Sequence, residues 1–256
     1  MKPQFWTVLL STFSMNTFAQ DQHSQLNVGL GAMLSDSVYA GEGTRVIPIP
    51  LINYQGDRFF LQGITAGWKL KDSSPLEISA IAKFRFDGFS VEDLGEDELA
   101  QNGIDYNNLE DRDFALDAGI GMKWSGSLGE MEIELLQDVS NNSDGQEAMV
   151  QYGYPIPMWG GMVKFNAGFN WLSKDLANYY YGTLDEEVAR GVVEYRPNAV
   201  TNINFGISYF RPLTESWSLM TILNHSRLAD EIQNSPLTDK NTDNTTSILL
   251  GISKQF

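Results

Sequence analysis

Apolar and polar residues alternate along most of this chain with a period of two. In the clearest run, residues 76–87, six apolar side chains from Leu76 to Phe86 share one face and mostly charged or polar residues occupy the other. Such alternation predicts β-strands with one apolar face. The strands predicted in this way are residues 26–34, 58–70, 76–87, 114–124, 130–135, 148–154, 163–171, 203–209, 217–228 and 245–256.

The connections between these strands indicate the class of β-protein, because short and long connections alternate. Transmembrane barrels show this asymmetry, with short periplasmic turns and long outer loops, whereas sandwiches have no such requirement. We therefore predict an all-β fold, an antiparallel transmembrane β-barrel with short periplasmic turns and long extracellular loops. The short connections are residues 71–75, 125–129, 155–161 and 211–216, and the long ones are residues 35–57, 88–112, 140–146, 173–200 and 229–244.

Aromatic residues lie in or beside the short connections and at the end of the last strand. Indole side chains prefer the membrane interface. The last strand turns Ile248, Leu250 and Ile252 to one face, as expected for a strand that closes a barrel within lipid. The predicted periplasmic aromatic girdle consists of Trp68, Trp124, Trp159, Trp217 and Phe256.

The strand count depends on residues 35–57. Pro48 and Pro50 interrupt an alternating run within this segment, and proline lacks the N–H donor that a central strand needs. We expect an edge strand, a partial hairpin or a plug inside the lumen. Ten strands are then favoured, and twelve is the alternative if a further strand exists, because single-chain bacterial barrels have an even number.

Charged side chains opposite the apolar faces are predicted to line the lumen. They can line a small pore, or they can pair with one another and fill it. Ten strands leave little open space once side chains are placed, so we favour the filled lumen. The predicted lumen-facing charges are Glu77, Lys83, Arg85, Asp87, Asp117, Lys123, Glu132, Glu134 and Lys164.

The composition is that of one exported domain. The 256 residues are 42% hydrophobic and 20% charged without an interior break in composition, which predicts a single domain. Residues 1–19 combine Lys2, an apolar run and the small residues Thr17 and Ala19, the pattern of a secretory signal. Residues 20–256 then form the barrel. The chain has no cysteine, which excludes a thiol nucleophile, a disulfide and Cys-ligated zinc.

The formal net charge of −16 argues against a nucleic-acid partner, because phosphate binding needs clustered Lys and Arg. The acidic residues concentrate in the long connections. They either keep these loops solvated or hold divalent cations near the anionic lipid surface.

Three features resemble parts of catalytic or metal sites, and none completes one. His225 and Ser226 are adjacent and point to opposite faces of a strand, whereas a hydroxyl and its base must share a face. His225 with Asp230 is the remaining candidate pair. Residues 239–243 begin like a calcium loop, but Leu250 stands where the bidentate glutamate is required. We predict no enzymatic activity, no cofactor and no metal.

Several short motifs occur in an order that resembles the MipA/OmpV family of Gram-negative outer-membrane proteins. The likeness covers residues 26–256. One departure is Lys254, which occupies the place where the family typically has an aromatic residue, and it predicts a weaker signal for barrel assembly. The motifs are Arg45 to Pro50, residues 56–60, residues 180–183 and residues 234–237.

The resemblance implies a barrel in the Gram-negative outer membrane. We expect this barrel to be a monomer surrounded by lipid and lipopolysaccharide. Family members are linked to the scaffolding of peptidoglycan-remodelling enzymes. The leading hypothesis is therefore a non-enzymatic scaffold whose partners are a lytic transglycosylase and a murein synthase. A narrow channel for small solutes and an adhesin acting through the outer loops are the alternatives. Short periplasmic turns limit a scaffold, because stable interfaces normally bury more than about 1,000 Å²; the contact is then weak or needs the N-terminal tail.

Overall fold

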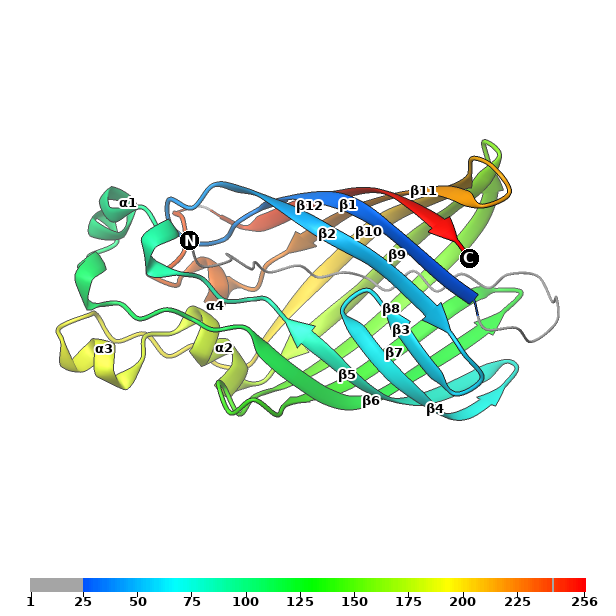
Figure 1. Cartoon of the computed structure of the whole chain (residues 1–256). Helices are drawn as coiled ribbons and strands as arrows, with labels where there is room; N and C mark the ends of the chain where they lie inside the picture. Colours follow the sequence, from blue (N-terminus) through cyan, green and yellow to red (C-terminus); the bar gives the residue numbers. More distant parts are fainter. Residues whose placement is uncertain (1–24, 241) are drawn as a thin grey trace.

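The computed structural model describes residues 25–240 and 242–256 and shows a β-barrel with short helices at one end (Figure 1). Twelve antiparallel strands close into one barrel, in which β1 pairs with β12. The predicted signal segment 1–19 lies outside the described residues. The strands are β1 (Gln25–Asp36), β2 (Thr44–Gln55), β3 (Phe59–Gln62), β4 (Thr65–Ser73), β5 (Leu76–Arg85), β6 (Ala115–Gly126), β7 (Gly129–Asp138), β8 (Gln146–Met158), β9 (Gly161–Leu172), β10 (Val200–Pro212), β11 (Trp217–Arg227) and β12 (Asn244–Gln255).

The strands turn alternate side chains inward and outward. In β1, Leu26, Val28, Leu30 and Leu34 are exposed on the outside, whereas Met33 is buried inside. Large exposed apolar side chains cover the outside of the wall all round the barrel. A wall that is apolar outside and polar inside is suited to lipid. The predicted all-β transmembrane barrel is therefore confirmed.

The described residues form twelve strands, so the second predicted count is right and the favoured count of ten is not. Residues 44–55 form the full strand β2 and do not plug the lumen. The segment predicted as one strand at residues 58–70 forms two, because Gly63 turns the chain with a φ of 57°, a conformation that glycine adopts readily. These two added strands keep the number even.

β2 accommodates two prolines because much of one edge has no partner strand. It pairs with β1 along its whole length but with β3 only at Asn53–Gln55. The Ile52 carbonyl accepts a hydrogen bond of 2.8 Å from Gly63 and so points to the β3 side. Alternate residues of a strand direct their backbone groups to the same side, so Pro48 and Pro50 face this unpaired side as well. The expectation of an edge strand at the prolines is right for this part of β2.

Five connections gather at the end of the barrel opposite the C-terminus (Figure 1). We call them the cap: residues 37–43, 86–114, 139–145, 173–199 and 228–243. By the general rule for such barrels, this end is extracellular and the short-turn end is periplasmic. No helix among the described residues has the length and apolar character needed to cross a bilayer. The cap helices are η1 (Val91–Asp93), α1 (Glu96–Gln101), η2 (Tyr106–Asn108), α2 (Lys174–Tyr181), α3 (Asp185–Ala189) and α4 (Asp230–Gln233).

Candidate functional site

Ion pairs cross the inner face of strands β5 to β9. Lys83 Nζ lies 2.8 Å from Glu134 Oε2, and Lys164 Nζ lies 3.0 Å from Glu130 Oε2. In both pairs the two residues come from strands separated by one other strand. Their side chains meet because each points into the lumen. Opposite charges at these distances neutralise one another, so this wall fills the lumen with paired side chains.

Arg85 joins three carboxylates at the cap end of β5. Its guanidinium nitrogens lie 2.7 Å from Asp87, 2.6 Å from Asp117 and 2.5 Å from Glu147. Asn170 donates a further hydrogen bond of 3.3 Å to Glu147. A buried arginine requires carboxylate partners to offset its lost hydration. Three carboxylates around one guanidinium leave this cluster with net negative charge.

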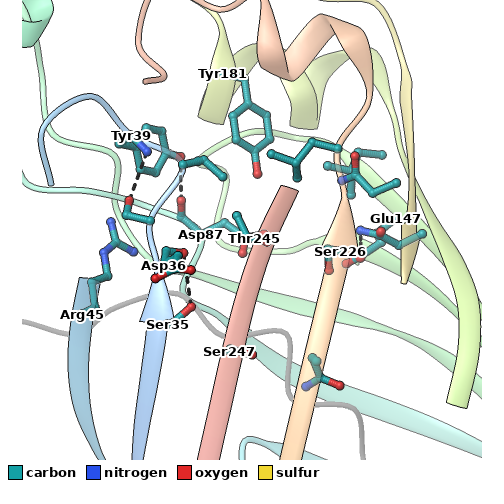
Figure 2. A pocket seen from close by; sticks show the side chains of 17 residues that line it. Ser35, Asp36, Tyr39, Arg45, Asp87, Glu147, Tyr181, Ser226, Thr245 and Ser247 are labelled. Atoms are coloured by element: carbon teal, nitrogen blue, oxygen red, sulfur yellow. Dashed lines mark hydrogen bonds between the residues drawn. The ribbon is translucent and has the colours of Figure 1, made fainter. Parts of the chain in front are cut away.

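A cavity of about 100 Å³ lies between the Arg85 cluster and the cap. Figure 2 shows Tyr39 and Tyr181 of the cap above it, with Asp36 and Ser247 on strands that border it. Three carboxylates line the cavity against the single guanidinium of Arg45. Its volume is well below the roughly 300–1,000 Å³ of sites for drug-sized ligands. The cavity has room for a polar head group or a few water molecules.

The inner wall changes character just below this cavity. Four strands that line the cavity with Ser35, Arg45, Asn224 and Ser247 place apolar side chains two residues further into the barrel. We call this group the apolar inner patch: Met33, Ile47, Ile222 and Leu249, with Ile49, Leu51 and Met220 packed against them. The lumen thus has a charged wall on β5–β9 and an apolar wall on β1, β2, β11 and β12.

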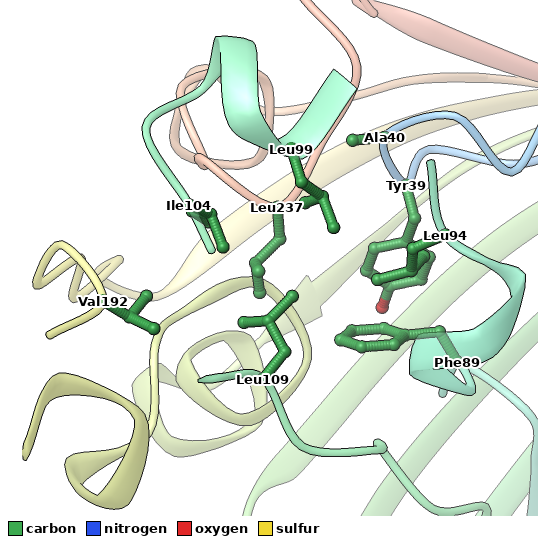
Figure 3. Close-up of a cluster of buried hydrophobic side chains, with 9 residues drawn as sticks. All are labelled: Tyr39, Ala40, Phe89, Leu94, Leu99, Ile104, Leu109, Val192 and Leu237. Atoms are coloured by element: carbon green, nitrogen blue, oxygen red, sulfur yellow. The ribbon is translucent and has the colours of Figure 1, made fainter. Parts of the chain in front are cut away.

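The cap is a packed structure with its own hydrophobic core. Figure 3 shows Leu99 and Leu237 facing each other near Tyr39 and Phe89, and with Val192 the cluster draws on four different connections. The Tyr39 hydroxyl donates a hydrogen bond of 2.8 Å to the Asp87 carbonyl. The cap therefore covers the outer mouth of the barrel as a folded layer.

A sequence signal for this core was present in the acidic segment 88–112. Its buried apolar residues recur every five positions, at Phe89, Leu94, Leu99, Ile104 and Leu109. A period of five belongs neither to a helix nor to a strand, so hydrophobic periodicity predicted only a loop here.

Arg112 and Glu187 hold two cap connections together. Arg112 Nη1 lies 2.8 Å from Glu187 Oε1, and both side chains are 0% exposed. Glu187 also accepts a hydrogen bond of 2.7 Å from the Leu184 N–H. Burial by itself would raise the pKa of Glu187, but the hydrogen bonds and charge of Arg112 outweigh it and lower that pKa. The pair thus supports the ionised carboxylate.

Large apolar side chains are exposed at the short-turn end. Leu128 and Leu213 occupy turns, and Trp159 is 75% exposed in the β8–β9 turn. Trp159 has a φ of 53°, a left-handed conformation that is unusual for a bulky residue. Its carbonyl accepts a hydrogen bond of 2.9 Å from Tyr209. We call Leu128, Trp159, Leu213, Trp217 and Phe256 the terminal rim.

The structure places eight of the nine predicted lumen charges on inward-facing strand positions, and Asp87 lies just beyond β5. It brings all nine into ion pairs, including Lys123 with Glu132 at 3.9 Å and Glu77 with Lys69 at 3.8 Å. Three inward charges that the prediction omitted, Glu130, Glu147 and Lys69, complete these pairs. Their strand phase is the same as that of the predicted residues, so the alternation alone contained the signal.

Four members of the predicted aromatic girdle lie at the short-turn end, and Trp68 lies deeper. Trp124 is near the end of β6, Trp159 is in a turn, Trp217 begins β11 and Phe256 follows β12. Trp68 pairs with Ala80, which pairs with a residue four positions before Trp124 in β6. The β4–β5 hairpin extends past Trp68 before it turns.

The residues considered for catalysis and metal binding lie apart. His225 is on the outside, with Nδ1 3.0 Å from Thr246 Oγ1, whereas Ser226 faces inward and donates a hydrogen bond of 2.7 Å to Asn204. The Asp239 carboxylate accepts a hydrogen bond of 3.0 Å from the Gly41 N–H. Each of these side chains thus has a structural partner.

The chain is similar to outer-membrane proteins over nearly its whole length. Residues 28–256 match the family model described as MltA-interacting protein MipA. The chain is 28% identical over 250 residues to MltA-interacting protein of Escherichia coli (strain K12), with 97% of this chain and 96% of that protein covered. It is 26% identical over 249 residues to putative outer membrane protein YiaT of the same strain, with 97% and 98% covered. The solved structure of the NanC porin covers 90% of this chain and 98% of its own, at 10% identity and a TM-score of 0.45.

Proposed function

This chain belongs to the MipA/OmpV family of outer-membrane proteins, and from that premise we propose that it is a non-enzymatic barrel that holds a murein-cleaving enzyme at the periplasmic face of the outer membrane. The relative in Escherichia coli is named for an interaction with MltA. The partner class in this proposal is a lytic transglycosylase, with a murein synthase as a further member of the complex.

The exposure and backbone conformation of Trp159 are the main support for this proposal. A tryptophan at positive φ, 75% exposed at the tip of a turn, is in an energetically costly conformation, and such conformations cluster at functional sites. Tryptophan is also among the residues that contribute most to protein interfaces. Leu128 and Leu213 add exposed apolar surface in neighbouring turns.

The closed interior supports an anchoring role over a conducting one. Ion pairs fill the wall around Lys83 and Arg85, and the cap covers the outer mouth. The terminal rim is made of short turns, so its surface is modest and the proposed contact is weak and transient.

A cross-linked pull-down of the tagged mature protein from intact cell envelopes tests the proposal. We expect recovery of a lytic transglycosylase, and a several-fold loss of that recovery with Trp159→Ser. Trp68→Ser is the matched control, because Trp68 is also exposed on the outer face but lies deeper in the wall. Recovery of lipopolysaccharide and abundant bystanders alone, or equal recovery with Trp159→Ser, would overturn the proposal.

A narrow channel is the second candidate, and the cavity of about 100 Å³ inside the barrel favours it. Planar-bilayer recordings distinguish the two functions. A channel predicts single-channel conductance whose ion selectivity changes when Lys83→Glu reverses a lumen charge. An anchoring barrel predicts no steps above the bilayer baseline in either protein.

A further inference from the structure

The barrel wall has a gap in its outer half between β2 and β5. The β3–β4 hairpin fills the space between these strands only as far as its turn at Gly63. Beyond that turn, the ladders of the described residues place no strand between β2 and the end of β5. Three strand spacings separate β2 from β5 at the hairpin, or about 14 Å between backbones. The contact between Tyr39 and Asp87 closes the gap at the top.

The sequence of β2 is suited to an edge that stays open in lipid. An unpaired N–H in hydrocarbon is costly because no water can satisfy it. Pro48 and Pro50 have no N–H, and both face the unpaired side, as the Ile52 hydrogen bond to Gly63 establishes. A strand that approached this edge of β2 would also find two hydrogen-bond donors missing at Pro48 and Pro50. The edge is therefore adapted to remain without a partner strand.

Apolar side chains line both sides of this gap. On the outside, Val46 is 68% exposed and Phe84 is 47% exposed. On the inside, β2 turns Ile47, Ile49 and Leu51 toward the lumen, where they belong to the apolar inner patch. The unpaired edge of β2 thus carries apolar side chains on its lipid side and on its lumen side, and the opposite wall of the lumen is charged.

The polar cavity lies at the cap end of the same inner wall. On β2, Arg45 lines the cavity and Ile47, two residues away, belongs to the patch. Asp36, Asp87 and Glu147 line the cavity together with Arg45. Arg45 is paired with Glu42, and the single charge of Arg85 is shared among Asp87, Asp117 and Glu147, so the surroundings of the cavity keep a net negative charge. Charge complementarity therefore favours a neutral or cationic group in the cavity over an anionic one.

We propose that the gap between β2 and β5 is a lateral portal that binds an amphiphile from the outer leaflet. The hydrocarbon chain enters between the strands and lies against Ile47, Ile49 and Leu51, and the neutral or cationic head occupies the cavity under the cap. The packed cap covers the outer mouth of the barrel, so in this proposal such a molecule arrives from the membrane side. This binding site goes beyond the proposed anchoring function and is independent of it.

Site-specific labelling tests the portal in the full-length mature protein in lipid nanodiscs. Because the chain has no cysteine, Ile49→Cys carries a single bimane fluorophore. Phospholipids brominated on their acyl chains quench a fluorophore that they reach. Met149→Cys is the control, since Met149 is buried on the inner face of β8, which pairs with strands on both sides.

We expect the bimane at position 49 to be quenched several-fold more strongly than the one at position 149. Equal quenching at the two positions would overturn the portal. Should Ile49→Cys fail to assemble, Leu51→Cys places the label at the next inward position of β2 and the same comparison applies.

Two probes with the same tail test the head site. In nanodiscs without brominated lipid, dodecylamine should shift the emission of the label at position 49 to shorter wavelength at several-fold lower concentration than dodecanoate. Glu147→Gln should reduce that preference, because it removes the charge of a buried carboxylate at the cavity. An equal response to both probes, or a preference for dodecanoate, would overturn the assignment of the cavity to a neutral or cationic head.

Discussion

Arg112 and Glu187 lie 75 residues apart in the chain and form a bidentate ion pair that is fully buried in the cap, with nitrogen-to-oxygen distances of 2.8 and 2.9 Å. Arg112 also donates to the carbonyls of Tyr179 and Gly182. One guanidinium therefore joins the β5–β6 connection to the β9–β10 connection. The cap depends on this pair to keep two acidic segments in contact.

Removing the charge of Glu187 should open the cap without unfolding the barrel. Loss of one partner from a buried pair leaves the other charge uncompensated, which typically costs about 3–5 kcal/mol. Limited proteolysis of Glu187→Gln should cleave residues 86–114 and 173–199 much faster than in the wild type. Glu186→Gln, on the exposed side of the same helix, should be cleaved at the wild-type rate. Equal rates in both variants would show that the pair does not hold the cap.

The cap should loosen at acidic pH. The pKa of Glu187 is lowered from its ordinary value of 4.5, so its ionised form stabilises the cap above that value. The contribution is lost as the pH falls through the lowered pKa. Burial, with Glu42 and Glu92, raises the pKa of Asp93 and gives the opposite trend.

Comparison with Glu187→Gln cancels the Asp93 effect and isolates Glu187. Hydrogen exchange of residues 173–199, corrected for the intrinsic exchange rate, should increase between neutral pH and pH 3 in the wild type. The same change should be much smaller in Glu187→Gln. An identical pH response in the two proteins would contradict the assignment.

Arg85→Gln should destabilise the barrel, because Asp87, Asp117 and Glu147 lose their shared counter-charge. The unfolding temperature in detergent, read from heat-dependent mobility on gels, should fall. Addition of Glu147→Gln should restore part of the loss, since it removes one uncompensated carboxylate. A double variant as unstable as the sum of the two single variants would show that the cluster is not coupled.

Pro48→Val with Pro50→Val should promote association of barrels. The double variant restores two N–H donors on an unpaired edge, and such an edge tends to pair with another strand. Chemical cross-linking in detergent should give a dimer that the wild type lacks. Pro212→Val, at an exposed position of the short-turn end, is the control and should remain like the wild type. A monomeric double variant would show that the prolines do not control pairing.

The sequence by itself determined which side of the wall each strand residue occupies. Strand geometry places alternate residues on opposite faces, so a period of two assigns Lys83 and Arg85 to the interior and Phe84 to lipid. The sequence also indicated that the strand with Pro48 and Pro50 lacks a partner strand on one side, because proline has no N–H to donate to a neighbouring strand. These features are local, and local geometry fixes them.

Only the tertiary structure decided the strand count, the ion-pair partners and the cap. The segment at residues 58–70 divides at Gly63 because β3 pairs with β2 and β4 pairs with β5, and a period of two does not show which segments pair. Arg85 meets Glu147, 62 residues away, because closure of the barrel brings their inner faces together. The apolar residues of the cap find one another across four connections. Such relationships depend on which segments become neighbours in space, and a one-dimensional pattern of residue types does not contain that information.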